Sequence, residues 1–186
     1  MSTSIVEVPG LVTGTWAIDP SHSEVGFSVR HLMVSKVKGS FKTFEGTITI
    51  AEDPLASRVE ASIDAWSVDT RDENRDNHLR SSDFFEVENY PKLTFVSTAV
   101  RPRGRDYVVT GDLTIRGVTR SVDLDLEFNG VSPDPWGGTR AGFSASTEIS
   151  RADFGIEFNI PMDGGGVVVG DKIKISLEVE AVLQTN

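Results

Sequence analysis

The sequence predicts an all-β protein whose strands form an antiparallel sandwich or a closed barrel. Two observations carry this prediction. Apolar and polar residues alternate with a period of two along most of the chain, and only one segment has the pattern of a helix. Strands with one polar and one apolar face belong to antiparallel sheets, and about eight or nine of them in one domain are typical of a sandwich or a barrel.

The first two strands are predicted at residues 15–19 and 24–31. In the second strand the apolar face contains Phe27 and Val29, and the next position on that face is His31. A neutral imidazole donates one hydrogen bond and accepts another, so it is an unusual end for a face that packs into a core. His31 is therefore a candidate functional residue.

The alternation then slips by one residue near Lys42–Thr43. The inward positions are odd up to Phe41 and even from Phe44 onward. A β-bulge produces such a slip, and bulges bend strands where barrels turn corners. We therefore expect strong curvature here, followed by strands at 44–50 and 58–64.

Only the segment 70–82 is predicted to be helical. Thr70 and Glu73 have the spacing of a capping box, and Asp72 adds a negative charge near the helix N-terminus. Leu79 is the one strongly apolar residue of this segment, so the helix is too polar for a core element. We expect a short lid or connector across one end of the sheet.

The second half of the chain contains five further strands, at 92–100, 107–115, 121–128, 139–149 and 171–183. Arg116-Gly117-Val118 separates two of them so tightly that they are predicted to form a hairpin. Trp136-Gly137-Gly138 is predicted to be another turn. The glycine-rich segment 161–172 lacks the ending of a P-loop and precedes a strand, so it is predicted to be a flexible loop.

Composition excludes several classes of protein. The 186 residues fit one domain. The 18 basic and 28 acidic side chains give a formal charge of −10, which disfavours binding to nucleic acids and to anionic membrane faces. The absence of cysteine excludes disulfides and thiolate metal sites. The first residues have no signal-peptide pattern, and no apolar run has the length of a membrane span, so we expect a cytoplasmic protein.

No constellation of polar residues demands an enzyme. His22, His31 and His78 suggest a three-histidine zinc site, but their spacing matches no ligand signature, and we expect no metal. The acidic pair Asp123 and Asp125 lies on the polar face of a strand, where solubilising charge is the simpler interpretation. There is also no nucleophile elbow around a serine.

The remaining candidate site is the interior of a barrel. An eight-stranded barrel either fills itself with side chains or holds one small ligand. Small residues at inward or adjacent positions would leave room for a ligand: Gly26, Gly39, Ala61, Ala141 and Ala145. The alternative, in which the strands pack together without a cavity, stays open.

At this point the sequence resembles a known family. The phrase WAIDPSHSEVGFSVRHLMVSKVKGSFKTFEGTI is similar to the opening of YceI-like proteins, which are lipocalin-like barrels that hold polyisoprenoids and other long amphiphilic lipids. Further matches are NRDNHLRSSDFFEVENYPKLTF, YVVTGDLTIRGVTRSVDL, ISRADFGI and VGDKIKISLEVE, so that the resemblance extends from Trp16 to Ala181.

The resemblance implies an extended eight-stranded antiparallel barrel at residues 15–186, after an N-terminal extension at 1–14, with an apolar tunnel. We expect the tunnel wall to contain Phe27, Val29, Phe41, Phe44, Ile63, Leu79, Phe84, Phe95, Leu113, Ile115 and Phe143. The family's polar positions fall on His31, Asp76, His78 and Arg80, which we expect at the polar end of the ligand. The alternative is that the last three anchor the helix to the barrel.

The resemblance thus implies a non-enzymatic protein that carries or stores a long-chain isoprenoid or fatty amphiphile, with no cofactor besides that lipid. Two other functions stay open: an enzyme acting on such a lipid with His31 or His78 as acid–base, and a barrel without ligand that binds a partner. The exposed rims of an antiparallel barrel are also compatible with a homodimer.

Overall fold

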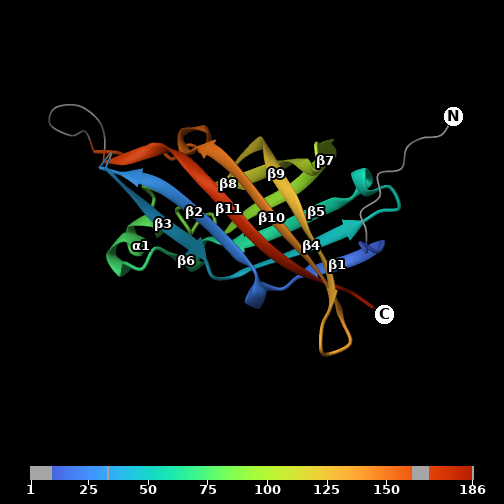
Figure 1. Ribbon diagram of the computed structural model, residues 1–186. Coiled ribbons are helices and arrows are strands. Elements are labelled where there is room, and N and C mark those ends of the chain that lie inside the picture. The colour runs from blue at the N-terminus through green and yellow to red at the C-terminus, as the bar shows by residue number, and fades with distance from the viewer. Residues whose placement is uncertain (1–9, 33, 161–167, 186) are drawn as a thin grey trace.

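The alternating segments pair into one closed barrel of eight antiparallel strands (Figure 1). The computed structural model describes residues 10–32, 34–160 and 168–185. Around the ring the strand order is β1-β4-β5-β7-β8-β9-β10-β11, and β11 pairs with β1 again. The predicted fold class is confirmed.

The elements have the following bounds. The ring consists of β1 Gly14–Ile18, β4 Phe44–Ile50, β5 Arg58–Asp64, β7 Lys92–Arg103, β8 Asp106–Ile115, β9 Val118–Pro133, β10 Thr139–Ser150 and β11 Val169–Leu183. Outside the ring lie β2 Glu24–His31, β3 Ser35–Phe41, β6 Val68–Asp69 and the helix α1 Glu73–Arg80. Four short 3-10 turns complete the described part: η1 Pro20–His22, η2 Pro54–Ala56, η3 Ala65–Ser67 and η4 Arg151–Phe154.

The strands β2 and β3 extend two strands of the ring beyond a break. β11 pairs with β1 at Ala181–Leu183 and with β2 along most of its remaining length. β4 pairs with β1, and β3 pairs with β2 in the same way. β1–β2 and β3–β4 are therefore two long strands, each interrupted by a bend.

The bend between β3 and β4 lies where the alternation slips. The slip is confirmed, but the bulge predicted to cause it is wrong: β3 ends at Phe41, and β4 begins at Phe44. The backbone N–H groups of Lys42 and Thr43 turn away and donate to the carbonyl oxygen (3.1 Å) and the hydroxyl (3.0 Å) of Ser67. Lys42 and Thr43 lie between the β2–β3 pairing, which ends at Phe41, and the β4–β5 pairing, which begins at Phe44. A bulge would instead be an extra residue within one continuous pairing.

The predicted turns join the strands as expected. Arg116 and Gly117 connect β8 to β9 with φ values of 51° and 74°, a two-residue turn whose twist matches that of the flanking strands. Residues 134–138 connect β9 to β10. Most of the glycine-rich segment, residues 161–167, lies outside the described residues, so its predicted loop is not described.

The predicted capping box of the helix is wrong. The N-cap of α1 is Asp72, whose carboxylate accepts from the Arg75 N–H at 3.0 Å, while Thr70 bonds elsewhere. Asp has a stronger preference than Thr for this position and lies directly before the first helical residue. The helix stays polar, and of its residues only Asp76 is buried.

The barrel has two distinct ends. The end that carries α1, η4 and the β2–β3 turn is here called the η4 end, and the end that carries β1, η2 and the β7–β8 turn is called the β1 end (Figure 1). One apolar cluster surrounds Phe41, Phe154 and Ile115, and a second surrounds Trp16, which is completely buried. No helix in the described part of the chain is long and apolar enough to cross a membrane.

Candidate functional site

The barrel encloses an apolar cavity of about 300 Å³. Every strand except β6 contributes to its wall, and α1, η4 and the segment after α1 contribute at the η4 end. On β11 the wall extends from Val169 to Val179, which is roughly 33 Å along an extended strand. The inward side chains of β9 and β11, such as Leu124 and Ile175, are only half-buried, because they face this space.

All eleven side chains that were expected in an apolar wall line the cavity. They are Phe27, Val29, Phe41, Phe44, Ile63, Leu79, Phe84, Phe95, Leu113, Ile115 and Phe143. Nine of them lie on strands, where alternation indicates the inward side, because inward positions of a closed barrel all face one interior. Leu79 on α1 and Phe84 after it were expected from the family resemblance.

The small inward residues have two different roles. Gly26, Ala61 and Ala145 line the cavity, where their small size leaves space. Gly39 and Ala141 do not line it. Ala141 is buried in the apolar cluster that contains Trp16, so the expectation that it leaves room for a ligand is wrong. A Cβ at Gly39 would overlap the ring of Phe27. Gly39 therefore seats an aromatic ring in the wall, and the expectation that it leaves room for a ligand is wrong.

The four polar residues expected at the end of the ligand do not line the cavity. Asp76 is 7% exposed, and its Oδ1 accepts hydrogen bonds from the N–H (2.8 Å) and the hydroxyl (2.6 Å) of Thr70. It therefore anchors α1 to the chain that leaves β6, as in the structural alternative. Asp76 was expected to orient another residue that binds the ligand, but its carboxylate bonds to Thr70 instead.

Arg80 has the same anchoring role. Its Nε donates to the carbonyl oxygen of Trp66 at 2.9 Å and its Nη2 donates to that of Val68 at 3.2 Å. The guanidinium also lies 4.6 Å from the centre of the Trp66 ring, within the range of a cation–π contact. These contacts connect the last turn of α1 to η3 and β6, and Arg80 is not among the residues that line the cavity.

The two histidines lie at the η4 end without reaching the cavity. His78 Nε2 is 2.8 Å from Asp83 Oδ2, and its ring packs edge-on against Phe84 and Phe158, with centroids 5.0 and 4.9 Å away. His31 ends β2 and pairs with Val169 of β11. Both lie at the η4 end, and neither is among the residues that line the cavity.

Of the three charged residues that line the cavity, Glu45 and Arg58 are exposed, and only Arg151 is buried, at 6% exposure. Its Nε donates to the carbonyl oxygen of Gly170 (2.8 Å), and its Nη1 donates to those of Ile156 (3.1 Å) and Phe158 (2.8 Å). Its Nη2 donates to the carbonyl oxygen of Val169 at 3.3 Å. The guanidinium thereby fastens η4, the segment after it and the start of β11 together.

Sequence reasoning missed Arg151, although a signal was present. The inward residues of β10 are odd-numbered up to Ile149, and Arg151 occupies the next inward position. His31 was singled out by the same break in the pattern. The two residues flank the start of β11, because Val169 pairs with His31 and accepts from Arg151.

The charge of Arg151 has no ion-pair partner among the described residues. Burial lowers the pKa of its guanidinium, and the negative charge of Asp171 partly opposes that change. The Asp171 carboxylate is itself occupied by the Ser150 hydroxyl at 2.5 Å, which lowers its pKa. A buried cation in an apolar wall is costly unless an anion approaches it, so this position favours a negatively charged group in the cavity.

At the β1 end the wall contains Ser57, Arg58 and Tyr107. Arg58 is exposed and pairs with Glu60 at 2.9 Å, and the Ser57 hydroxyl accepts from the N–H of Ala51 at 3.1 Å. The polar groups of Ser57 and Arg58 are thus engaged near the surface. The β1 end therefore offers no buried charge comparable to Arg151.

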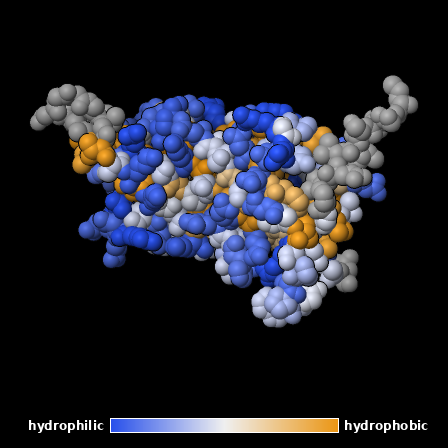
Figure 2. Space-filling model, in the orientation of Figure 1, coloured by the Kyte–Doolittle hydropathy of each residue, from blue (hydrophilic) through white to orange (hydrophobic). Residues whose placement is uncertain are grey.

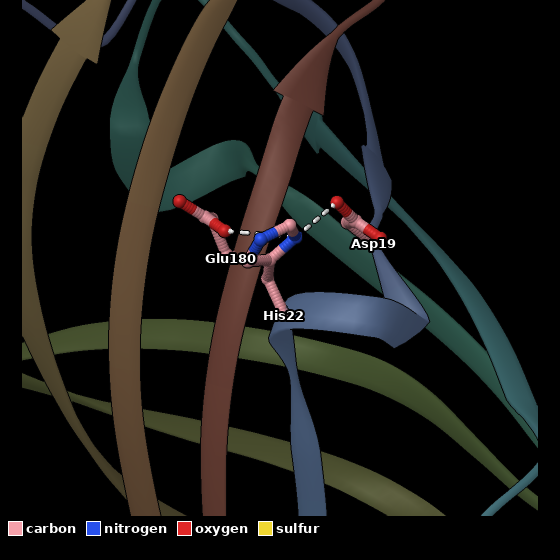
Figure 3. Close-up of side chains that lie close together, drawn as sticks. All are labelled: Asp19, His22 and Glu180. Atoms are coloured by element: carbon pink, nitrogen blue, oxygen red, sulfur yellow. Dashed lines mark hydrogen bonds and ion pairs between the residues drawn. The ribbon is translucent and has the colours of Figure 1, made fainter. Parts of the chain in front are cut away.

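A separate cluster at the β1 end brings Asp19, His22 and Glu180 together (Figure 3). His22 Nδ1 lies 2.9 Å from Asp19 Oδ2 and 3.7 Å from Glu180 Oε2. Arg140 Nη1 donates to the same Asp19 oxygen at 2.8 Å and to Glu180 Oε2 at 3.4 Å. A guanidinium already neutralises these oxygens and would repel a divalent cation, so the cluster is an ion-pair network that ties β1–β2 to β10 and β11.

The three histidines of the zinc hypothesis do not meet. His22 belongs to the network at the β1 end, while His31 and His78 lie at the η4 end. Among the described residues, Asp19, His22 and Glu180 form the one group whose ligating atoms lie together.

Comparisons with known proteins agree with this architecture. The family model for the YceI-like domain matches residues 16–181. Protein YceI of Escherichia coli O17:K52:H18 is 43% identical over 164 residues, which cover 88% of this chain and 83% of that protein. Among solved structures, the Campylobacter jejuni YCEI protein has a TM-score of 0.69 at 32% identity, and the match covers 90% of this chain and 96% of that one.

A third similar protein is a polyisoprenoid binding domain from Saccharophagus degradans, implicated in plant cell wall breakdown. Its TM-score is 0.71 at 18% identity, and the match covers 93% of this chain and all of that one (100%). At this identity the similarity establishes a shared fold.

Proposed function

Because the chain belongs to the YceI-like family, we propose that it binds one long-chain lipid of the polyisoprenoid type inside the barrel, as a carrier or store and without catalysis. The observation that carries this proposal is the continuous apolar wall from Val169 to Val179 on β11 and around the rest of the ring. The polyisoprenoid binding of the Saccharophagus degradans domain, which shares the fold, supports the same class of ligand.

The driving force for binding is removal of the lipid tail from water. Each methylene that enters an apolar cavity contributes about 0.8 kcal/mol, so a long tail gains far more than a small apolar molecule. Aromatic side chains such as Phe27, Phe95 and Phe143 provide wide contact surfaces at several levels of the wall. A flexible hydrocarbon chain fits such a long, nearly featureless wall better than a rigid polar substrate does.

We place the polar head group of the lipid at the η4 end, next to Arg151. A guanidinium has five N–H donors, and the four hydrogen bonds to Gly170, Ile156, Phe158 and Val169 use four of them. The remaining Nη2 donor and the buried charge favour a phosphate or carboxylate. The lipid tail then extends toward the β1 end. His31, which flanks the same stretch of β11, stays a predicted contact of the outer part of the head group.

The absence of a catalytic role is supported by the placement of the candidate acid–base residues. Neither His31 nor His78 lines the cavity, and His78 is paired with Asp83. The anchoring contacts of Asp76 and Arg80 position Leu79 and Phe84 in the wall. The helix therefore completes a binding site rather than supplying reactive groups to it.

Extraction of the purified protein with organic solvent, followed by mass spectrometry, tests this function. We expect about one long-chain lipid for each chain, and an Arg151→Met variant should retain neutral lipids while losing those with anionic head groups. A lipid-free extract, together with no uptake of added polyprenyl phosphate or polyprenol, would overturn the proposal. Chemical change of an added lipid that His31→Ala abolishes would show an enzyme instead.

A further inference from the structure

Three exposed apolar side chains lie at the tip of the η4 end. Leu32 and Val34, in the β2–β3 turn, are 40% and 84% exposed, and Ile160 is 52% exposed. The N–H of Leu32 donates to the Val168 carbonyl at 2.8 Å, and the N–H of Val168 donates to the Ile160 carbonyl at 3.1 Å. Figure 2 shows apolar surface at this extremity of the molecule. We call Leu32, Val34 and Ile160 the apolar tip.

Leu32 is an unfavourable residue for its own turn. Its φ is 53°, in the left-handed region where glycine or asparagine is favoured and a bulky side chain is strained. The side chain is 40% exposed and belongs to neither apolar cluster, so core packing does not account for a leucine here. A leucine at this position reduces stability without filling the core, as residues at binding surfaces often do.

Basic side chains surround the tip. Arg30, Lys36, Lys38, Lys172 and Lys174 are exposed on the adjacent strands β2, β3 and β11. None of the ion pairs within residues 10–32, 34–160 and 168–185 includes any of them. Glu148 is opposite Lys174 on β10, and the Asp171 carboxylate is bonded to Ser150 and to the N–H of Ala152. We call these five basic residues the basic belt.

The spacing of the tip and the belt matches the profile of a membrane interface. Arg30 pairs with Lys36 two residues below Leu32, which is about 7 Å along the strand. Lys38 and Lys174 both pair with Ser28, about 7 Å further. Apolar groups that enter a bilayer surface by about 5–10 Å would place such a belt at the level of the lipid phosphates.

We propose that the apolar tip and the basic belt dock the η4 end on an anionic phospholipid bilayer. The net charge of −10 does not prevent this contact, because at physiological ionic strength charges more than about 8 Å away are largely screened. The basic belt lies close to the apolar tip, so its charges contribute most to this contact. The proposal therefore differs from the expectation drawn from the net charge alone, which disfavours binding to an anionic membrane.

Docking in this orientation would bring the lipid site next to the membrane, and this step rests on the proposed lipid binding. Val29 and Val169, on the strands that carry the tip, line the cavity, and Arg151 binds the Val169 carbonyl. The end of the cavity assigned to the lipid head group therefore faces the bilayer. A lipid could then exchange at the membrane surface with its tail directed into the barrel.

Flotation with vesicles tests the docking surface. The protein is mixed with vesicles of phosphatidylcholine alone or with 30% phosphatidylglycerol. We expect it to float with the anionic vesicles at low salt, and expect this binding to fall when salt is raised. Lys36→Glu/Lys38→Glu should weaken binding by about 25-fold or more, at roughly fivefold for each basic residue lost near the surface. The control Arg103→Glu/Arg105→Glu reverses two charges at the β1 end and should bind like the parent protein.

A second variant separates docking from folding. Leu32→Asn removes the apolar side chain but suits the left-handed backbone, so it should melt no lower than the parent protein and still bind more weakly. The proposal is overturned if no anionic vesicle binds, if Leu32→Asn binds normally, or if heparin is bound as tightly as the vesicles. If the purified protein contains lipid but does not bind vesicles, only the docking proposal is refuted. If it binds vesicles but contains and takes up no lipid, the proposed lipid binding is refuted.

Discussion

Arg151 donates a hydrogen bond through its Nε to the carbonyl oxygen of Gly170 at 2.8 Å, and this contact joins η4 to the start of β11. The same guanidinium satisfies three further buried or half-buried carbonyls. A single cation thus organises the end of the cavity and also lines its wall. The fold and the proposed lipid site depend on the same side chain.

Replacement of Arg151 should affect stability and lipid choice separately. Arg151→Met leaves the carbonyl oxygens of Ile156 and Phe158 without a donor, which should lower the free energy of unfolding by about 2–4 kcal/mol. Urea unfolding measures this loss. Arg151→Lys should retain part of the preference for anionic lipids, and equal affinity of the two variants for polyprenyl phosphate would contradict the role of the charge.

Filling the cavity should abolish lipid uptake without unfolding the barrel. Ala145 lines the cavity, and its neighbour Ser146 is exposed on the outer face of β10. We expect Ala145→Phe to weaken lipid binding at least tenfold, because the new ring occupies free space instead of overpacking a core. Ser146→Phe is the matched control and should bind normally in a fluorescent-lipid displacement assay. Equal binding by both variants would mean that the lipid lies elsewhere.

Gly39 should tolerate no side chain. A methyl group at this position would overlap the ring of Phe27, so Gly39→Ala should destabilise the protein by about 1–3 kcal/mol. At Gly142 the nearest atom to a new Cβ is 3.5 Å away, and Gly142→Ala should be nearly neutral. Thermal melting of the two variants gives the comparison, and a neutral Gly39→Ala would show that the Phe27 ring is free to move.

Asp76 should act on stability and not on the lipid. Its buried carboxylate accepts two hydrogen bonds from Thr70, so Asp76→Ala should lower the free energy of unfolding by about 2–3 kcal/mol. Lipid affinity, measured well below the melting temperature, should stay within a factor of three of the parent value. A large loss of affinity in a folded variant would restore the head-group contact first expected for Asp76.

The ion pairs of Asp19 should make the stability of the protein fall at acidic pH. The Arg140 guanidinium, together with Ser21 and His22, holds the pKa of the Asp19 carboxyl well below its usual value of 3.8. A carboxyl with a lowered folded-state pKa stabilises the fold above its unfolded-state pKa, and this contribution disappears as the pH falls. The free energy of unfolding should therefore decline from about pH 5 downward, and the decline should be shallower in Asp19→Asn. Parallel curves for the two proteins would contradict the contribution of this network.

The fold could be predicted from the sequence because its signal is local and repeated. Alternation identifies which side of each strand faces inward, and in a closed barrel all inward sides share one interior, so Phe27 and Phe143 are found although they lie far apart in the chain. The bend at Lys42–Thr43 was located correctly but misinterpreted. Its cause is two hydrogen bonds to Ser67, a residue that local patterns cannot connect to this position.

The polar part of the site was harder to predict because it depends on long-range partners. Asp76 and Arg80 have the right chemistry for a head group, but Thr70, Trp66 and Val68 already occupy their polar atoms. Arg151 follows an inward strand position as His31 does, yet its importance arises from carbonyls of the segment 156–170 that gather around it. Only the folded chain shows which of several polar residues faces the cavity.

The most direct measurement is a crystal structure of the protein with a polyprenyl phosphate that carries bromine at the far end of its chain. The anomalous signal of bromine and the density of the phosphate give the position and the direction of the lipid independently. We predict the phosphate beside Arg151 and the bromine inside the barrel toward Tyr107. A phosphate beside Arg58 at the β1 end, or a bromine outside the barrel, would contradict the proposed binding mode.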